Sequence, residues 1–215
     1  MRLCDQIAEK KEQARAKMDP EVLRTMAAAP VELVQSGIAD GALKEGATAP
    51  PFALPNAIGE VVTLEGRLAK GPVVLNFYRG GWCPYCNLEL AALHEVLPEI
   101  TAKGGQLIAV SPELSDQSLS VAEKFALEFQ VLSDVSNQAA RAFGLVFALP
   151  EALRPIYAGF GIDLPKFNGD DSFELPMPAT YVIDRHGVIR HAFVDADHTK
   201  RLEPADVLAA LDGLD

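Results

Sequence analysis

The sequence has few cysteines, a deficit of positive charge and no long apolar run, and each shortage excludes a class of protein. Its 215 residues contain only three cysteines, too few for the disulfide framework of a small secreted domain. Nineteen basic side chains against 30 acidic ones give a formal net charge of −11, so nucleic acids and anionic membrane surfaces are not expected partners. No window approaches the roughly 18 consecutive apolar residues that span a bilayer, so no membrane association is expected.

The first residues also lack the pattern of an export signal. Segment 1–17 mixes acidic and basic side chains and has no apolar core, so we expect a cytoplasmic protein. In that reducing compartment a close pair of cysteines is more often catalytic or metal-binding than structural. The length suits one mid-sized domain, and a hydrophobic content of 49% excludes a disordered or fibrous chain.

From residue 46 onward, apolar runs rich in β-branched residues alternate with helical patterns. We expect buried strands at 73–78, 106–111 and 179–184, a hairpin return at 188–194, and helices at 84–103, 116–128, 137–143 and 204–214. Pro98 should kink or shorten the first of these helices. This order predicts an α/β domain over residues 46–215, with a central mixed sheet flanked by helices.

Residues 1–45 are predicted to form a helical extension that packs on this domain or on a partner subunit. Asp19 and Pro20 suit the cap and the first position of a second helix. That helix is expected to break at Pro30. Farther along, residues 145–176 contain several prolines and are expected to be irregular.

The chemistry is concentrated between Arg79 and Cys86. There a C-x-x-C pair, Cys83 and Cys86, follows a buried strand and opens a helix. Pro84 suits the first helical position, which places Cys83 at the N-cap, where free amides and the helix dipole favour a thiolate. The spacing also places the two Cα atoms within disulfide range, roughly 4.4–6.8 Å. We therefore expect a redox-active pair that cycles between dithiol and disulfide.

A metal or cluster site and a pair of inert buried cysteines are the weaker interpretations. Structural zinc needs four ligands, and the chain has no second C-x-x-C and no ligand spacing among its four histidines. A helix N-terminus activates a thiol, which argues against inert cysteines. We expect no metal or organic cofactor, and we interpret Cys4 as an incidental free thiol.

Three neighbours of the pair are candidate supporting residues. Arg79 either offers a cation to a thiolate or a peroxide oxygen, or is a solvated charge at the end of a strand. Trp82 is expected to shield the sulfurs. Glu89 either pairs with a cation near the site or lies on the surface.

Residues 46–213 resemble the thioredoxin-fold peroxiredoxin superfamily, in particular the group of alkyl hydroperoxide reductase and thiol-specific antioxidant (AhpC/TSA) proteins. The segments that carry the resemblance are Ala49–Pro55, Val74–Cys86 with the string Phe77-Tyr-Arg-Gly-Gly-Trp-Cys-Pro-Tyr-Cys86, Glu89-Leu90, Ser111-Pro112 and Pro178–Asp184. The resemblance implies a thioredoxin-like fold, thiol-dependent peroxidase activity and a possible homodimer. It also places Cys86 at the position of the peroxidatic cysteine.

The departures from ordinary peroxiredoxins point to a second resemblance. The family's activating Thr falls on Cys83 and its catalytic Arg on Pro178, which leaves Arg79 as a candidate substitute for that Arg. Trp82 followed by C-x-x-C resembles thioredoxin, Cys-Pro-Tyr-Cys resembles glutaredoxin, and Pro178 resembles the cis-proline that faces the thioredoxin disulfide. In those families the first cysteine attacks. The resemblances thus favour Cys86 for peroxide and Cys83 for disulfide substrates.

Taken together, these patterns predict a cytosolic thiol peroxidase that reduces hydrogen peroxide or organic hydroperoxides. A thiolate would become a sulfenic acid and condense with its neighbour to the Cys83–Cys86 disulfide. A dithiol donor such as thioredoxin or glutathione would then reduce that disulfide. Two alternatives stay open: a thioredoxin- or glutaredoxin-like disulfide reductase with little peroxidase activity, and a non-enzymatic redox sensor whose disulfide switches a partner surface.

Overall fold

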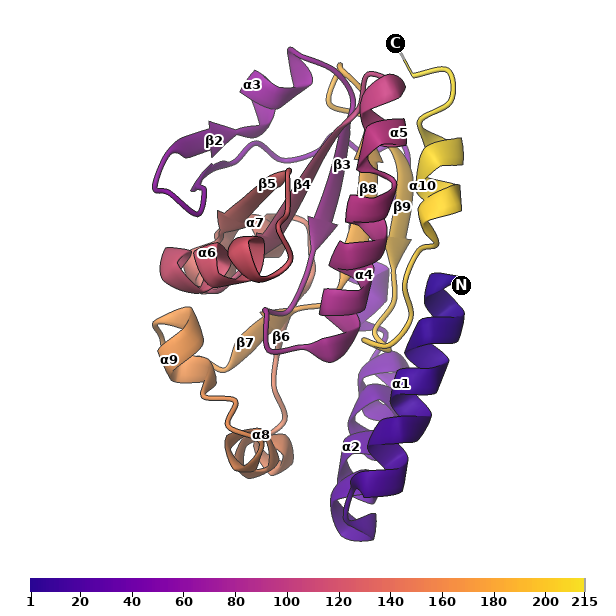
Figure 1. Ribbon diagram of the computed structural model, residues 1–215. Helices are drawn as coiled ribbons and strands as arrows, with labels where there is room; N and C mark the ends of the chain where they lie inside the picture. The colour runs from indigo at the N-terminus through magenta and orange to yellow at the C-terminus, as the bar shows by residue number, and fades with distance from the viewer. Residues whose placement is uncertain (215) are drawn as a thin grey trace.

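Five strands in the order β5-β4-β3-β8-β9 form the central sheet of the computed structural model, which describes residues 1–214 (Figure 1). Strand β3 (Val73–Phe77) runs parallel to β4 (Gln106–Ser111), which runs parallel to β5 (Gln130–Ser133). On its other side β3 pairs antiparallel with β8 (Ala179–Ile183), and β8 pairs antiparallel with β9 (Ile189–Val194). Every residue of β3 and β8 is buried, which explains why these strands are largely apolar. The predicted mixed sheet is confirmed.

One face of the sheet is covered by helices α4 (Pro84–Glu95), α5 (Leu97–Ala102), α6 (Ser115–Lys124) and α10 (Pro204–Ala210). Leu93, Ile100 and Val207 from three of these helices pack in one cluster with sheet residues. The expected interruption near Pro98 is confirmed, since α4 ends at Glu95 and α5 begins two residues later. Figure 1 shows α4 running along the sheet. The dithiol lies at the N-terminal end of this helix.

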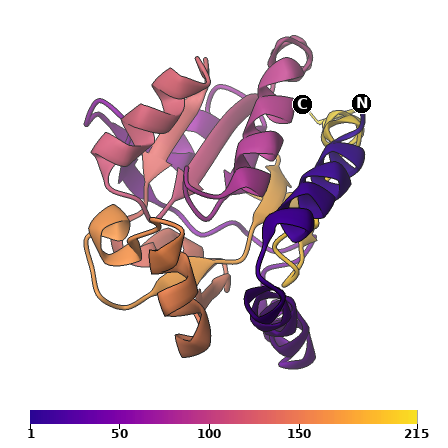
Figure 2. The same cartoon turned by 60° about the horizontal axis from the view of Figure 1, so that its bottom comes forward.

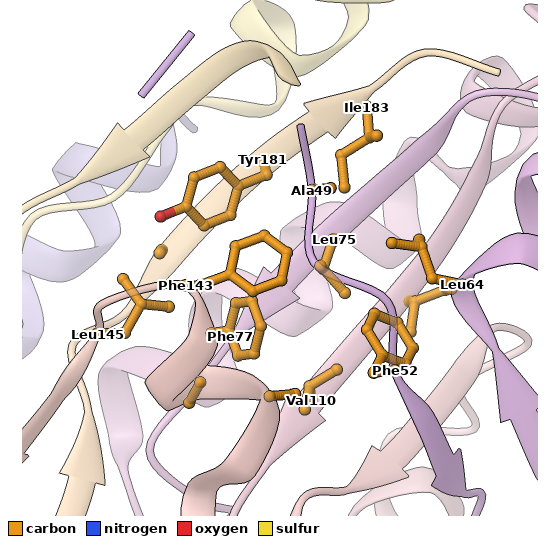
Figure 3. Packing of buried hydrophobic residues seen from close by; sticks show 14 of the residues in the cluster. Ala49, Phe52, Leu64, Leu75, Phe77, Val110, Phe143, Leu145, Tyr181 and Ile183 are labelled. Carbon is orange, nitrogen blue, oxygen red and sulfur yellow. The ribbon is translucent and has the colours of Figure 1, made fainter. Parts of the chain in front are cut away.

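The other face carries the larger core. Helices α3 (Leu64–Leu68) and α7 (Gln138–Ala142), the short 3-10 turn η2 (Val135–Asn137) and the hairpin of β1 (Ala53–Pro55) and β2 (Val61–Thr63) lie on this side. Figure 3 shows the rings of Phe77, Phe143 and Tyr181 packed together, with centroids 5.1 Å apart for each pair that includes Phe143. This packing fixes the strand that leads into the dithiol.

Residues 145–176 are more regular than the sequence suggested. They contain the antiparallel pair β6 (Val146–Ala148) and β7 (Glu174–Pro176), the 3-10 turn η3 (Glu151–Leu153), and helices α8 (Arg154–Gly159) and α9 (Leu164–Asn168). The expectation of an irregular segment was wrong because Pro155 and Pro165 stand in the first turn of a helix, where a missing N–H costs nothing. The segment packs around Leu149, Leu153 and Tyr157.

The N-terminal residues form two helices, α1 (Leu3–Lys17) and α2 (Pro20–Gln35), followed by the 3-10 turn η1 (Ile38–Gly41). We call α1 and α2 the helical arm. As predicted, the Asp19 side chain accepts hydrogen bonds from the first amides of α2. The predicted break at Pro30 was wrong, because α2 continues through it. No residue of α2 is fully buried, so water can solvate the carbonyl that a helical proline leaves without a donor.

The helical arm lies beside α4 and the segment that precedes α10 (Figure 2). Leu3 and Ile7 of α1 are buried against Ala92 of α4. The backbone amides of Leu3 and Cys4 donate to the carboxylate of Glu203, at 3.0 and 2.8 Å. None of the helices between residues 1 and 214 combines the length and the apolar character of a membrane span. The division of the chain at residue 46 stays a prediction.

Candidate active site

The two cysteines occupy the positions that the sequence predicted. Cys83 is the N-cap of α4 in an extended conformation, and Pro84 begins the helix, which puts Cys86 in its first turn. Both are free thiols. Both are also buried, with 1% of Cys83 and none of Cys86 exposed, so neither sulfur is accessible to a bulky reactant. The N-cap position therefore does not make Cys83 the exposed sulfur.

Electrostatics distinguish the two thiols. Burial raises the pKa of Cys83, but a hydrogen bond from the Cys86 thiol and the positive charges of Arg79 and Arg201 together lower it to about 6. Burial raises the pKa of Cys86, and its hydrogen bond to Cys83 and the charge there raise it well above its usual value. At neutral pH the pair therefore holds a thiolate at Cys83 and a proton at Cys86.

Arg79 is a buried cation and not a solvated charge. It follows β3, and only 3% of it is exposed. Its Nη2 donates to the Tyr157 hydroxyl at 2.5 Å, and its guanidinium carbon lies 4.9 Å from the Trp82 ring centre and 5.7 Å from that of Tyr157. Among residues 1–214 no carboxylate forms an ion pair with Arg79, and its Nε has no partner. One donor of this buried cation is thus without a hydrogen-bond partner.

A second buried arginine, Arg201, contacts Cys86 from the loop between β9 and α10. Its Nη2 lies 3.5 Å from Cys86 Sγ, and its Nε lies 2.6 Å from Glu89 Oε2, with both charged side chains 2% exposed. Burial raises the pKa of Glu89 to about 7 against the opposing charge of Arg201. The predicted pairing of Glu89 with a cation is confirmed. The sequence analysis missed Arg201, although the need of a buried Glu89 for a cation was a signal to search for one.

The environment of Glu89 is completed by a chain of hydrogen bonds to the sheet. Thr180 Oγ1 donates to Glu89 Oε1 at 3.3 Å, and Asn76 Nδ2 donates to Thr180 Oγ1 at 3.0 Å. These polar residues interrupt the apolar runs of β3 and β8. Their place in the sheet is explained by this network, because an unpaired polar group in a buried strand would destabilise the fold.

Glu113 is, after Arg201, a second buried charged residue that the sequence analysis missed. It follows β4, is 2% exposed, and its Oε2 accepts a hydrogen bond from the Gly81 amide at 2.8 Å. Burial raises its pKa to about 7. Gly80 has a φ of 146°, and a Cβ there would lie 2.3 Å from Trp82 Nε1, so glycine is required. Glu113 and the two glycines fix the loop that enters the dithiol.

Trp82 lies beside the dithiol, whereas Pro178 lies with Arg79 in the wall of a cavity. Trp82 packs against the cluster that contains both cysteines, and its ring lies 5.7 Å from that of Tyr157. The peptide bond before Pro178 is trans, so the resemblance to a thioredoxin cis-proline was wrong on this point. Pro178 connects β7 to β8, and a trans bond keeps the backbone extended between them. Within the described chain, no three His, Cys, Asp or Glu side chains gather as potential metal ligands.

Comparison with known proteins agrees with this geometry. The family model described as the AhpC/TSA family matches residues 46–192. The chain belongs to the AhpC/TSA family. That match includes Cys83, Cys86 and Arg79, whereas Arg201 and the helical arm lie outside it. The AhpC/TSA resemblance inferred from the sequence is thus confirmed, and part of the site comes from segments beyond the shared region.

The relatives of this chain include proteins with two kinds of name. The chain is 29% identical over 146 residues to "Peroxiredoxin Q, chloroplastic" of Sedum lineare, covering 68% of this chain and 66% of that protein, slightly less than two thirds. It is 28% identical over 152 residues to "Thiol-disulfide oxidoreductase ResA" of Geobacillus thermodenitrificans, with 69% and 68% covered. "Peroxidoxin BcpB from Mycobacterium tuberculosis" has the same fold, with a TM-score of 0.63, 22% identity, and 80% and 99% of the two chains covered. The fold is therefore the thioredoxin-like fold of peroxiredoxins.

Proposed function

We propose that the protein is a thiol-dependent peroxidase that reduces hydrogen peroxide or organic hydroperoxides through Cys83 and Cys86. The observation that carries this proposal is a buried dithiol, with a low pKa at one sulfur, that lies between two buried arginines. Membership of the AhpC/TSA family supports the same chemistry. Burial of both sulfurs favours a small substrate such as a peroxide over a folded protein.

In the proposed reaction the Cys83 thiolate attacks the outer oxygen of the hydroperoxide. The O–O bond breaks, the alcohol or water leaves with a proton, and Cys83 becomes a sulfenic acid. The Cys86 sulfur then attacks the Cys83 sulfur, the sulfenic oxygen leaves as water, and the disulfide forms. Each cycle thus consumes two thiols and one hydroperoxide and gives one disulfide, one alcohol or water, and one water. The lower pKa of Cys83 favours this order over attack by Cys86.

The two arginines have different proposed roles. In this proposal Arg79, whose Nε has no hydrogen-bond partner, holds a peroxide oxygen and polarises the bond that breaks. Arg201, 3.5 Å from Cys86 Sγ, stabilises the negative charge that develops when Cys86 loses its proton before disulfide formation. Trp82 and Pro178 support Arg79 and the loop around it. Thioredoxin or glutathione as the reductant, a cytoplasmic location and a homodimer remain predictions.

Disulfide exchange with another protein is the second candidate function. The low pKa of Cys83 and the ResA relative favour it. The burial of Cys83 opposes it, because an attacking thiolate must reach the sulfur of its target in line. A redox sensor without turnover is the third possibility, and it predicts no catalytic consumption of either substrate.

The test is single-turnover loss of hydrogen peroxide on mixing with the fully reduced protein. Cys83→Ser should abolish the fast phase, and Cys86→Ser should keep one fast turnover that ends at a sulfenic acid. Cys4→Ser is the matched control, because Cys4 is an exposed thiol outside the site, and it should behave as wild type. Loss no faster than that of a free thiol in all four proteins would refute the peroxidase. Abolition by Cys86→Ser alone would assign the attack to Cys86.

A further inference from the structure

A cavity lies between helix α2 and Arg79, the buried cation whose charge lowers the pKa of Cys83. Its inner part, with a volume of about 40 Å³, is lined by Arg79 and by apolar side chains that include Met26, Leu33, Phe147 and Leu149. Its outer part, of about 250 Å³, lies between α1 and α2, and its lining includes the apolar Leu23 and Val31 and the charged Lys11, Arg15 and Asp197. The two parts have Met26, Pro30 and His198 in both linings, so they adjoin, and we call the two together the path.

The polarity of this path changes along its length. In the inner part, Met26, Leu33 and other apolar side chains lie around Arg79, whose Nε has no hydrogen-bond partner. In the outer part, the apolar side chains of α2 face the charged Lys11 and Arg15 of α1. His198 adds no charge, because burial and the positive charges of Arg79 and Arg201 hold its pKa well below its usual range. A ligand that fits this path therefore has a small polar end for the guanidinium and an apolar body that lies along α2.

The apolar side chains that α2 contributes to this path lie outside the region that the family model matches. Met26, Pro30 and Leu33 belong to α2, which precedes the family match at residues 46–192. The helix leaves other apolar side chains in solvent, and Val34 is 52% exposed. Met26 and Leu33 instead face the space beside Arg79. The helical arm thus contributes apolar side chains to the wall beside Arg79, and it contributes the charged Lys11 and Arg15 only to the outer part.

We propose that α2 is the specificity-determining wall of the substrate site, and that Met26 and Leu33 bind the organic group of a hydroperoxide whose O–O end lies at Arg79. This inference rests on the proposed function. It narrows the substrate to hydroperoxides with a sizeable apolar group, such as cumene hydroperoxide, in preference to hydrogen peroxide. Hydrogen peroxide has no group to bury, so it gains nothing from this apolar surface.

The first test compares kcat/KM for cumene hydroperoxide with kcat/KM for hydrogen peroxide. The double variant Met26→Phe/Leu33→Phe fills the path, and it should lower the ratio of the two constants by about tenfold, as expected for a crowded apolar pocket. Val34→Phe adds the same ring on the exposed side of the same helix and should leave the ratio unchanged. An unchanged ratio in the double variant, or an equal fall in the control, would overturn the proposal.

A binding measurement separates this proposal from the proposed peroxidase activity. The chain has one tryptophan, Trp82, which contacts Arg79 at the inner end of the path. The product alcohol 2-phenyl-2-propanol should change Trp82 fluorescence in wild type and in Val34→Phe, and should bind much more weakly to the double variant. Binding without peroxide turnover would refute the peroxidase and retain the pocket. Absence of binding in wild type, or equal binding in all three proteins, would overturn the pocket.

Discussion

Arg201 Nη2 lies 3.5 Å from Cys86 Sγ, although 115 residues separate the two in the sequence. The same guanidinium is 2.6 Å from a Glu89 oxygen, and both charged side chains are almost fully buried. One cation therefore stabilises a carboxylate and a thiol in a dry environment. The AhpC/TSA resemblance placed no arginine at the family's usual position, and the fold brings one to the dithiol from another direction.

The first prediction concerns the stability of this ion pair. Arg201→Met leaves Glu89 buried without its cation, which should cost about 3 kcal/mol of the free energy of unfolding. Glu89→Gln/Arg201→Met removes both charges and should recover most of that loss. Urea unfolding of the reduced proteins at pH 7 measures both effects. The interpretation fails if Arg201→Met is as stable as wild type, or if the double variant is no more stable than the single one.

The second prediction concerns the reactivity of Cys83. Alkylation by iodoacetamide in a Cys4→Ser background should titrate with a midpoint near pH 6, because the pKa of Cys83 is lowered to about 6. Arg79→Gln removes one of the charges responsible, so its midpoint should move to higher pH. Peptide mass spectrometry should place the first label on Cys83 and not on Cys86. A wild-type midpoint at the ordinary thiol value of about 8.5 would contradict the electrostatic account.

The third prediction is a thiol count. The reduced, denatured protein should give three titratable thiols, one for each cysteine in the chain. After one equivalent of hydroperoxide that count should fall to one, because Cys83 and Cys86 form a disulfide and Cys4 does not react. In Cys4→Ser the same treatment should take the count from two to none. A loss of only one thiol in wild type would indicate a sulfenic acid that does not condense.

The fourth prediction concerns the dependence of stability on pH. Burial raises the pKa of Glu113 to about 7, above the value of about 4.3 for an unfolded chain. The folded state binds the Glu113 proton more tightly than the unfolded state does. Protonation of Glu113 therefore adds to the free energy of unfolding. This contribution is fully present below about pH 4.3 and is lost as pH rises through about 7. Glu113→Gln keeps an acceptor for the Gly81 amide but has no proton to lose. Between pH 5 and pH 8 wild type should therefore lose on the order of 2 kcal/mol more than this variant.

Unfolding curves at the two pH values measure that difference. The contribution of Glu89 to the pH dependence cancels, because both proteins contain this residue. Glu123→Gln, an exposed carboxylate on α6, is the control and should retain the wild-type pH dependence. Equal pH dependence in wild type and Glu113→Gln would show that the raised pKa makes no contribution. A steeper loss in the variant would reverse the sign and refute the account.

Local patterns predicted the parts of this molecule that depend on neighbours in sequence. The buried strands, the start of α4 at Pro84 and the cap at Asp19 all follow from residue type and spacing. Pro30 was misjudged because a surface helix tolerates a lost hydrogen bond. The resemblance of Pro178 to the thioredoxin cis-proline suggested a cis peptide bond. In this fold the bond is trans, and Pro178 connects two strands.

The missing parts of the site depend on tertiary packing. Arg201 and Glu113 lie in loops with no periodic pattern, and only the folded sheet brings them to the dithiol. The sequence is compatible with an exposed Arg79. The fold buries this residue, because Tyr157 and Trp82 enclose its guanidinium. A sequence can show that Glu89 needs a cation when buried, but not which of its 19 basic residues supplies it.

The hydrogen bonds from Leu3 and Cys4 to Glu203 have a consequence for the order of events during synthesis. Leu3 precedes its partner by 200 residues, so the ribosome makes the first helix long before the residue that caps it. Helix α1 therefore cannot complete its docking until nearly the whole chain has emerged. The path to Arg79 has α1 and α2 in its walls, so the pocket should be the last part of the protein to form.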